Sequence, residues 1–102
     1  MQIVVMTVPE CASQEAALAA ARAVVDRADV PGAEVRHLVV STDEQARLLD
    51  FRGSPTFLVD GADPFSAQAP PVGLSCRVYR LGGRAVGCPS AAELAAAIAS
   101  SA

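Results

Sequence analysis

The chain of 102 residues is predicted to form an α/β fold, a mixed four-stranded sheet flanked by helices, with its elements in the order β-α-β-α-β-β-α. Three observations support this fold class: an apolar, β-branched run at residues 2–8, a helical spacing of apolar residues over 13–28, and an apolar run at 56–59 that follows a proline. Their order favours one parallel crossover and a terminal hairpin. The length is that of one domain, covering residues 1–102.

The N-terminal part of the chain is expected to form a strand, a helix and a second strand. The run at 2–8 is continuously apolar and is closed by Pro9, which is typical of a strand buried on both faces. Over 13–28 the apolar residues recur at three- and four-residue spacing, which indicates an amphipathic helix. Residues 34–40 alternate before becoming fully apolar, and this pattern predicts the second strand.

A short second helix is expected to begin at Ser41 and to end near Asp50. Ser41 and Glu44 are three residues apart, so that the hydroxyl and the carboxylate can form a capping box. The remaining predicted elements are a third strand at 56–59, a long proline-containing loop at 61–75, a fourth strand at 76–80, and a closing helix that follows a second capping box, Ser90 with Glu93.

Composition excludes several classes of function. The net charge is -3, and the eight basic residues are all arginines that do not cluster, so nucleic acid is not an expected partner. Without lysine, the chain has neither Schiff-base chemistry nor a phosphate-loop lysine. No apolar window approaches the roughly 20 residues that cross a bilayer, and no signal peptide is recognisable, so we expect a cytoplasmic protein without membrane partners. Three cysteines in such a chain indicate reduced thiols.

Cys11 is the strongest candidate for a catalytic residue. It lies between the first predicted strand and the first long helix, where the unpaired amides and the positive end of the helix dipole stabilise a thiolate. The thiolate is the nucleophilic form of cysteine. The alternative interpretation is a small buried residue at the start of a helix.

A second candidate region surrounds Pro55, which precedes the third predicted strand. If this strand runs antiparallel to the first, Ser54, Pro55 and Thr56 lie near Cys11, and a cis Ser54–Pro55 peptide would present its backbone to a bound thiol or peptide. The alternative is an ordinary trans proline in a turn. Phe65, in the long loop, is expected to cover the region of Cys11 or to contact a partner.

Cys11 together with Gly53-Ser54-Pro55-Thr56 resembles the redox motif and the cis-proline segment of the thioredoxin superfold, over nearly the whole chain. Residues 53–65 and 71–80 are similar to the small thioredoxin-like DF-type (seleno)proteins, often labelled alkylmercury lyase-like. The resemblance implies a thioredoxin-like sheet and a chalcogen-based site at Cys11.

The chain departs from the dithiol pattern because Gln14 occupies the position of the second cysteine. This departure leaves two alternatives. In a monothiol mode, Cys11 forms a mixed disulfide with a small thiol or a partner; otherwise, a cysteine from another part of the chain acts as the resolving thiol. The candidates for this second thiol are Cys76 and Cys88. If they do not act as the second thiol, Cys76 is a buried cysteine in a strand and Cys88 is a cysteine in a turn.

No metal or other cofactor is predicted. The chain has no Cys-x-x-Cys pair, and its one histidine, His37, lies in the second predicted strand, with its ring expected at the surface. Three hypotheses follow: a monothiol redox protein that acts on a small thiol or a protein or peptide partner; a non-catalytic binding module that uses the Pro55 groove and residues 61–75; and a soft-metal or organomercurial binder that uses thiolates.

Overall fold

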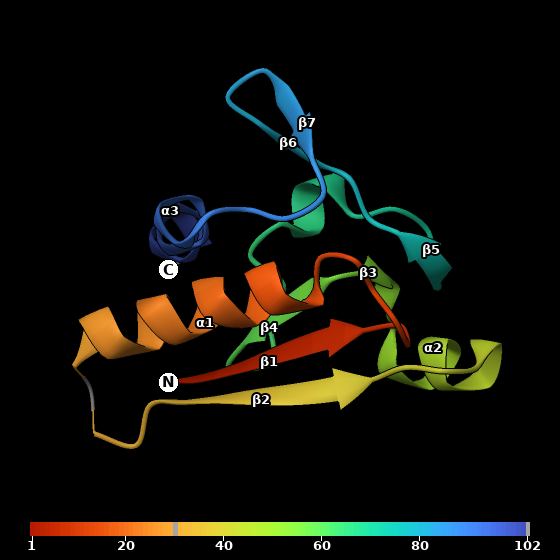
Figure 1. The fold of residues 1–102 in the computed structure, drawn as a ribbon, viewed down its shortest axis with the longest axis horizontal. Coiled ribbons are helices and arrows are strands. Elements are labelled where there is room, and N and C mark those ends of the chain that lie inside the picture. Colours follow the sequence, from red (N-terminus) through yellow and green to blue (C-terminus); the bar gives the residue numbers. More distant parts are fainter. Residues whose placement is uncertain (30, 102) are drawn as a thin grey trace.

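The N-terminal half of the chain forms a β-α-β unit, as predicted. In the computed structural model, which describes residues 1–29 and 31–101, strand β1 covers Gln2–Thr7, helix α1 covers Gln14–Ala28 and strand β2 covers Glu34–Val39. β1 and β2 pair in parallel, and α1 crosses one face of this pair (Figure 1). The predicted ends of these elements are confirmed to within one residue.

Strand β4, Thr56–Val59, completes the main sheet on the other side of β1. It runs antiparallel to β1, with Met6 opposite Thr56, and the strand order is β2-β1-β4. The start of β4 therefore lies at the same end of the sheet as the end of β1. This arrangement brings the segment around Pro55 toward the loop that carries Cys11.

The predicted four-stranded sheet with a strand over 76–80 is wrong. Within the described residues the main sheet has three strands, and two small two-stranded pairs lie outside it. Strand β5, Gly73–Cys76, pairs in parallel with strand β3, Arg52–Ser54. Strand β6, Tyr79–Leu81, forms an antiparallel hairpin with strand β7, Arg84–Val86. The expected strand is interrupted because the Arg77 side chain turns into the interior, while its N–H donates to the Ser54 carbonyl at 2.9 Å.

The remaining helices have well-defined first turns. Helix α2, Asp43–Leu49, is capped by Thr42 and Gln45, one residue later than the expected pair of Ser41 and Glu44. Helix α3, Ala91–Ser101, begins at the predicted capping box, in which the Ser90 N–H donates to Glu93 and the Glu93 N–H donates to Ser90. The long loop contains one short helical turn at Ser66–Gln68.

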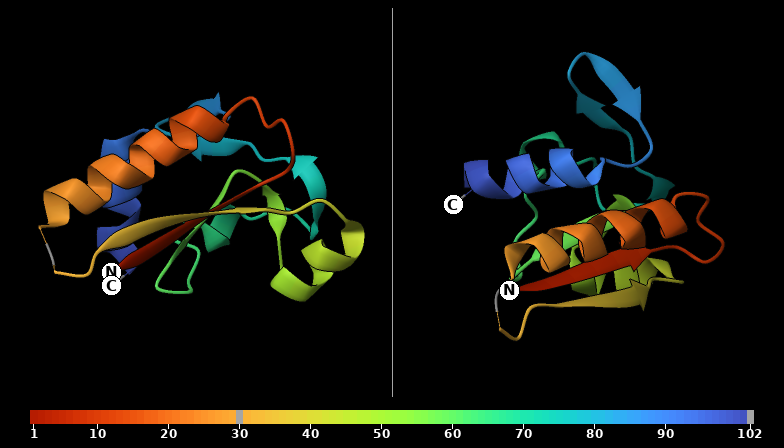
Figure 2. Two further views of the ribbon diagram at one scale, coloured as in Figure 1. Left: turned by 60° about the horizontal axis from the view of Figure 1, so that its bottom comes forward. Right: turned by 60° about the vertical axis from the view of Figure 1, so that its left-hand side comes forward.

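Two apolar clusters lie on opposite faces of the main sheet. α1 and α3 lie together on one face (Figure 2), where Leu18 and Leu94 pack with Ile3, Val5 and Phe57. The smaller cluster on the other face joins α2 to the end of β1, and it consists of Met6, Val40, Ala46 and Phe51. In the described part of the chain, none of the helices is long and apolar enough to cross a membrane.

Candidate functional site

Cys11 lies in the loop that connects β1 to α1. The chain leaves β1, passes through Glu10 in a left-handed conformation (φ 59°) and reaches Cys11, which is partly exposed. The Cys11 carbonyl accepts a hydrogen bond from the Gln14 N–H at 3.2 Å, and the Ser13 side chain makes no capping hydrogen bond. Cys11 is therefore an accessible thiol immediately before the first turn of α1, as the sequence predicts.

Cys88 reaches the same region from the connection between β7 and α3. A Cβ atom at Gly87 would lie only 3.1 Å from the Ser13 hydroxyl oxygen, so this connection packs directly against the start of α1. Cys88 is half-buried, and its thiol donates to the Pro89 carbonyl at 3.3 Å. Burial, the charge of Cys11 and the charge of Glu93, in that order, raise the pKa of Cys88 to about 11. The packing of Gly87 against Ser13 thus brings the segment that carries Cys88 beside the segment that carries Cys11.

A groove with a volume of about 720 Å³ leads to Cys88 between α1 and α3. One wall is the alanine-rich face of α1, where Ala16 and Ala20 leave room because their side chains are small. Arg84 and Glu93 face the groove from the other side and form an ion pair of 2.7 Å. A small molecule in this groove can therefore approach the Cys88 sulfur.

The Ser54–Pro55–Thr56 segment lies at the same end of the sheet. The Ser54–Pro55 bond is cis, and the Ser54 hydroxyl accepts a hydrogen bond from the Val8 N–H at 3.1 Å. All three residues of the segment are buried. The Ser54 carbonyl accepts from the Arg77 N–H and the Pro55 carbonyl from the Tyr79 hydroxyl. The contact of a partner with this segment stays a prediction, and the carbonyls that were expected to face it already have donors within the chain.

A buried Arg77–Asp63 ion pair supports this segment, and neither residue has a role predicted from the sequence. The Arg77 side chain has no exposed surface, and its guanidinium donates to the Asp63 carboxylate at 2.8 Å. It also donates to the Phe65 carbonyl at 3.0 Å and lies 4.8 Å from the centre of the Tyr79 ring. An arginine in an apolar strand usually extends into solvent, so the local pattern contained no signal for this pair.

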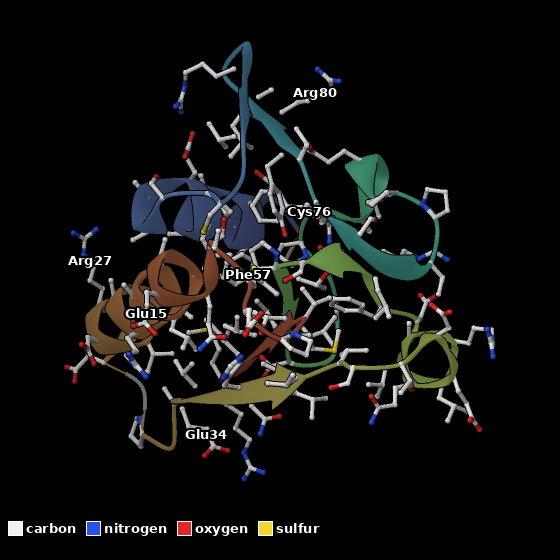
Figure 3. The ribbon with its side chains drawn as sticks, turned by 45° about the vertical axis from the view of Figure 1, so that its right-hand side comes forward. Glu15, Arg27, Glu34, Phe57, Cys76 and Arg80 are labelled. Carbon is white, nitrogen blue, oxygen red and sulfur yellow. The ribbon has the colours of Figure 1, made fainter. Side chains whose placement is uncertain are left out.

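Phe65 and Cys76, the other predicted site residues, do not line the groove beside Cys88. The Phe65 ring is 5% exposed and packs edge-to-face against Tyr79 with a centroid distance of 5.0 Å. Cys76 is exposed on β5, opposite Ser54 in the β3–β5 pair (Figure 3). Phe65 therefore belongs to the core, and a contact of this residue with a partner stays a prediction. Cys76 is an edge-strand thiol rather than a buried one.

The part of the chain that the structure describes contains no local cluster of metal ligands. Among residues 1–29 and 31–101, no group of three or more histidine, cysteine, aspartate or glutamate side chains is arranged to hold a metal ion. His37 is exposed and shares a hydrogen bond of 2.8 Å with the Thr7 hydroxyl. The three cysteines therefore do not form the three-thiolate site that the soft-metal hypothesis requires.

No protein-family model, curated protein or solved structure matches the chain. The chemistry available at the site is that of its side chains: one partly exposed thiol at a helix start, and a second, half-buried thiol whose pKa is raised by burial. A thiol that is accessible to a partner can exchange with disulfides.

Proposed function

We propose that the chain is a thioredoxin-like monothiol redox protein that uses Cys11 in thiol–disulfide exchange. The observation that carries the proposal is the placement of Cys11: it is accessible, it precedes the first turn of α1, and it follows β1 at the end of the sheet where Ser54 contacts Val8. The strand order β2-β1-β4, with β2 parallel and β4 antiparallel to β1, supports the thioredoxin-like assignment.

In the proposed reaction, the Cys11 thiolate attacks one sulfur of a partner disulfide. A bond forms between the Cys11 sulfur and that sulfur, the partner's own S–S bond breaks, and the second partner sulfur leaves as a thiolate that takes a proton from water. The product is a mixed disulfide on Cys11. Gln14, at the position of a second motif cysteine, has no sulfur with which to break this bond.

Cys11 lies beside the start of α1. Amide dipoles of a helix sum to a partial positive charge at its N-terminus, which attracts a nearby anion. The carbonyl of Cys11 is tied to the Gln14 amide at 3.2 Å, so the residue is held against the first turn of the helix. The partner is a small thiol compound in its disulfide form, or a protein or peptide disulfide.

Reaction with an aromatic disulfide tests the proposal, because the thiolate that it releases is coloured. The fully reduced protein is expected to show a rapid phase that Cys11→Ser removes and that Cys76→Ser retains. Since the rate of exchange follows thiolate character and access, we expect the rapid phase to be about tenfold or more faster than the reaction of the other thiols. A rapid phase that persists without Cys11 would reject the redox proposal in favour of the binding-module hypothesis.

A further inference from the structure

We propose that Cys88 is the resolving thiol of this site, which attacks the mixed disulfide on Cys11 and closes an intramolecular Cys11–Cys88 disulfide. This inference rests on the proposed exchange at Cys11 and extends it to a second residue. It turns a monothiol motif into a two-thiol site whose members come from opposite ends of the chain. The groove beside Cys88 is then the route by which a small thiol reaches the oxidised pair.

The contact between Gly87 and Ser13 places the two cysteines in the same region. Gly87 precedes Cys88, and Ser13 is two residues after Cys11. A Cβ atom on Gly87 would lie only 3.1 Å from the Ser13 hydroxyl oxygen, so the two segments pack closely at this point. Figures 1 and 2 show the connection from β7 to α3 passing the N-terminal end of α1. Cys88 also packs against the core cluster to which α1 contributes Ala17.

Interactions on both sides of Cys88 hold it in this position. On the β7 side, Arg84 forms the 2.7 Å ion pair with Glu93 of α3. On the α3 side, the Ser90 N–H donates to the same Glu93 carboxylate at 2.9 Å, and the Leu94 side chain is fully buried. The short segment between β7 and α3 is therefore tied at both ends, and its thiol stays beside the start of α1.

The charge of Cys11 affects how readily Cys88 loses its proton. While Cys11 is a thiolate, its negative charge is one of the causes that raise the pKa of Cys88, after burial and ahead of Glu93. A mixed disulfide carries no charge on the Cys11 sulfur, so this cause then disappears. Cys88 therefore becomes more acidic once the sulfur that it attacks has formed a mixed disulfide.

Cys76 does not fit the same role. It is exposed on β5 and lies opposite Ser54, and its charge is not among the causes that raise the pKa of Cys88. Among residues 1–29 and 31–101, no backbone hydrogen bond joins β5 to the connection between β7 and α3. Cys76 thus provides a matched control, since it is a thiol of the same chain without the proposed geometry.

The resolving step balances as a two-electron exchange. The Cys88 sulfur bonds to the Cys11 sulfur, the bond from Cys11 to the partner breaks, and the partner leaves with the proton that Cys88 gives up. Over both steps the protein loses two electrons and the partner disulfide gains them. A dithiol such as dithiothreitol returns the pair to its reduced form.

The inference is tested by treating the reduced protein with glutathione disulfide, digesting it with trypsin and weighing the peptides by mass spectrometry. Trypsin places the three cysteines in separate peptides, 1–22, 53–77 and 85–102, so each disulfide can be assigned. After reaction, the wild-type protein and Cys76→Ser are expected to contain peptide 1–22 linked to 85–102, with a mass lower by two hydrogens and no glutathione adduct. Cys88→Ser and Cys88→Ala are expected to accumulate glutathione on peptide 1–22. Two substitutions are used so that a folding defect in one does not decide the result.

The outcomes separate the inference from the function on which it rests. Cys88 is not the resolving thiol if the wild-type protein keeps glutathione on peptide 1–22 for as long as Cys88→Ser does. The same conclusion follows if peptide 1–22 becomes linked to peptide 53–77. Both outcomes leave the exchange at Cys11 intact. If peptide 1–22 carries no glutathione in Cys88→Ser, Cys11 is not the exchanging thiol, and both the proposed function and the resolving role are rejected.

Discussion

Replacing Asp63 by alanine should destabilise the fold strongly, because it leaves the Arg77 guanidinium buried without a counter-charge. The Arg77 side chain has no exposed surface, and the Asp63 side chain, 15% exposed, supplies the only carboxylate within ion-pair distance of it, 2.8 Å, among residues 1–29 and 31–101. The Phe65 carbonyl and the Thr56 hydroxyl would still accept hydrogen bonds from Arg77 at 3.0 Å and 3.3 Å. They are neutral acceptors and do not balance its charge.

The magnitude follows from this geometry. Removing one partner of a buried ion pair costs about 3–5 kcal/mol, because a charge is left uncompensated in the interior. Since two neutral acceptors remain and Asp63 is not completely buried, we expect the lower end of this range, about 3 kcal/mol. With a urea dependence of about 1–2 kcal/mol per molar for a domain of this size, the unfolding midpoint falls by about 1.5–3 M.

Urea unfolding followed by far-ultraviolet circular dichroism measures this change, since the chain has no tryptophan. The matched control is Glu34→Ala, which removes the acidic partner of Arg36 in a surface ion pair of 3.3 Å and should cost less than about 1 kcal/mol. Asp63→Ala combined with Arg77→Met removes both buried charges and should cost less than the sum of the single changes. Equal losses for Asp63→Ala and Glu34→Ala, or strict additivity in the double variant, would refute the reasoning.

Three further predictions concern Gly53, Cys88 and Tyr79. Gly53→Ala should lower the free energy of unfolding by about 2 kcal/mol, because φ is +103° and the new Cβ would lie 3.1 Å from the Arg77 Cβ. Gly83→Ala is the control: φ there is +79°, but the space around it is open, so the loss should be only about 1 kcal/mol. Equal losses of unfolding free energy in urea would contradict this prediction. The folded protein should also lose stability as the pH rises from 9.0 to about 11, since burial raises the pKa of Cys88 across this range and the unfolded chain releases the proton first. Burial also raises the pKa of Tyr79 above its ordinary value of 10.0. The absorbance of this single tyrosine should therefore show phenolate only when the protein unfolds. Phenolate absorbance from the folded protein near pH 10 would contradict the raised pKa.

Much of the fold could be predicted because its signals are local. The apolar run of β1, the helical spacing of α1, the capping box of α3 and the boundaries of β4 depend on residues that are neighbours in the chain. The position of Cys11 follows from the order of two such elements. Its proximity to the Ser54 segment required one further step, the antiparallel pairing of β1 with β4, which the structure confirms.

Features that depend on distant parts of the chain could not be predicted in this way. An arginine within 76–80 has the same local pattern whether it extends into solvent or, like Arg77, turns inward to meet Asp63. Similarly, nothing near Cys88 in the sequence indicates that Gly87 packs against Ser13. The periodicity of apolar residues indicates which side of a helix or strand a residue occupies. Which residue it contacts on another element depends on how the elements pack in three dimensions. The sequence was therefore enough to locate the partly exposed thiol at the start of α1, whereas the packing of the Cys88 segment against that helix start and the Arg77–Asp63 ion pair became visible only in the assembled fold.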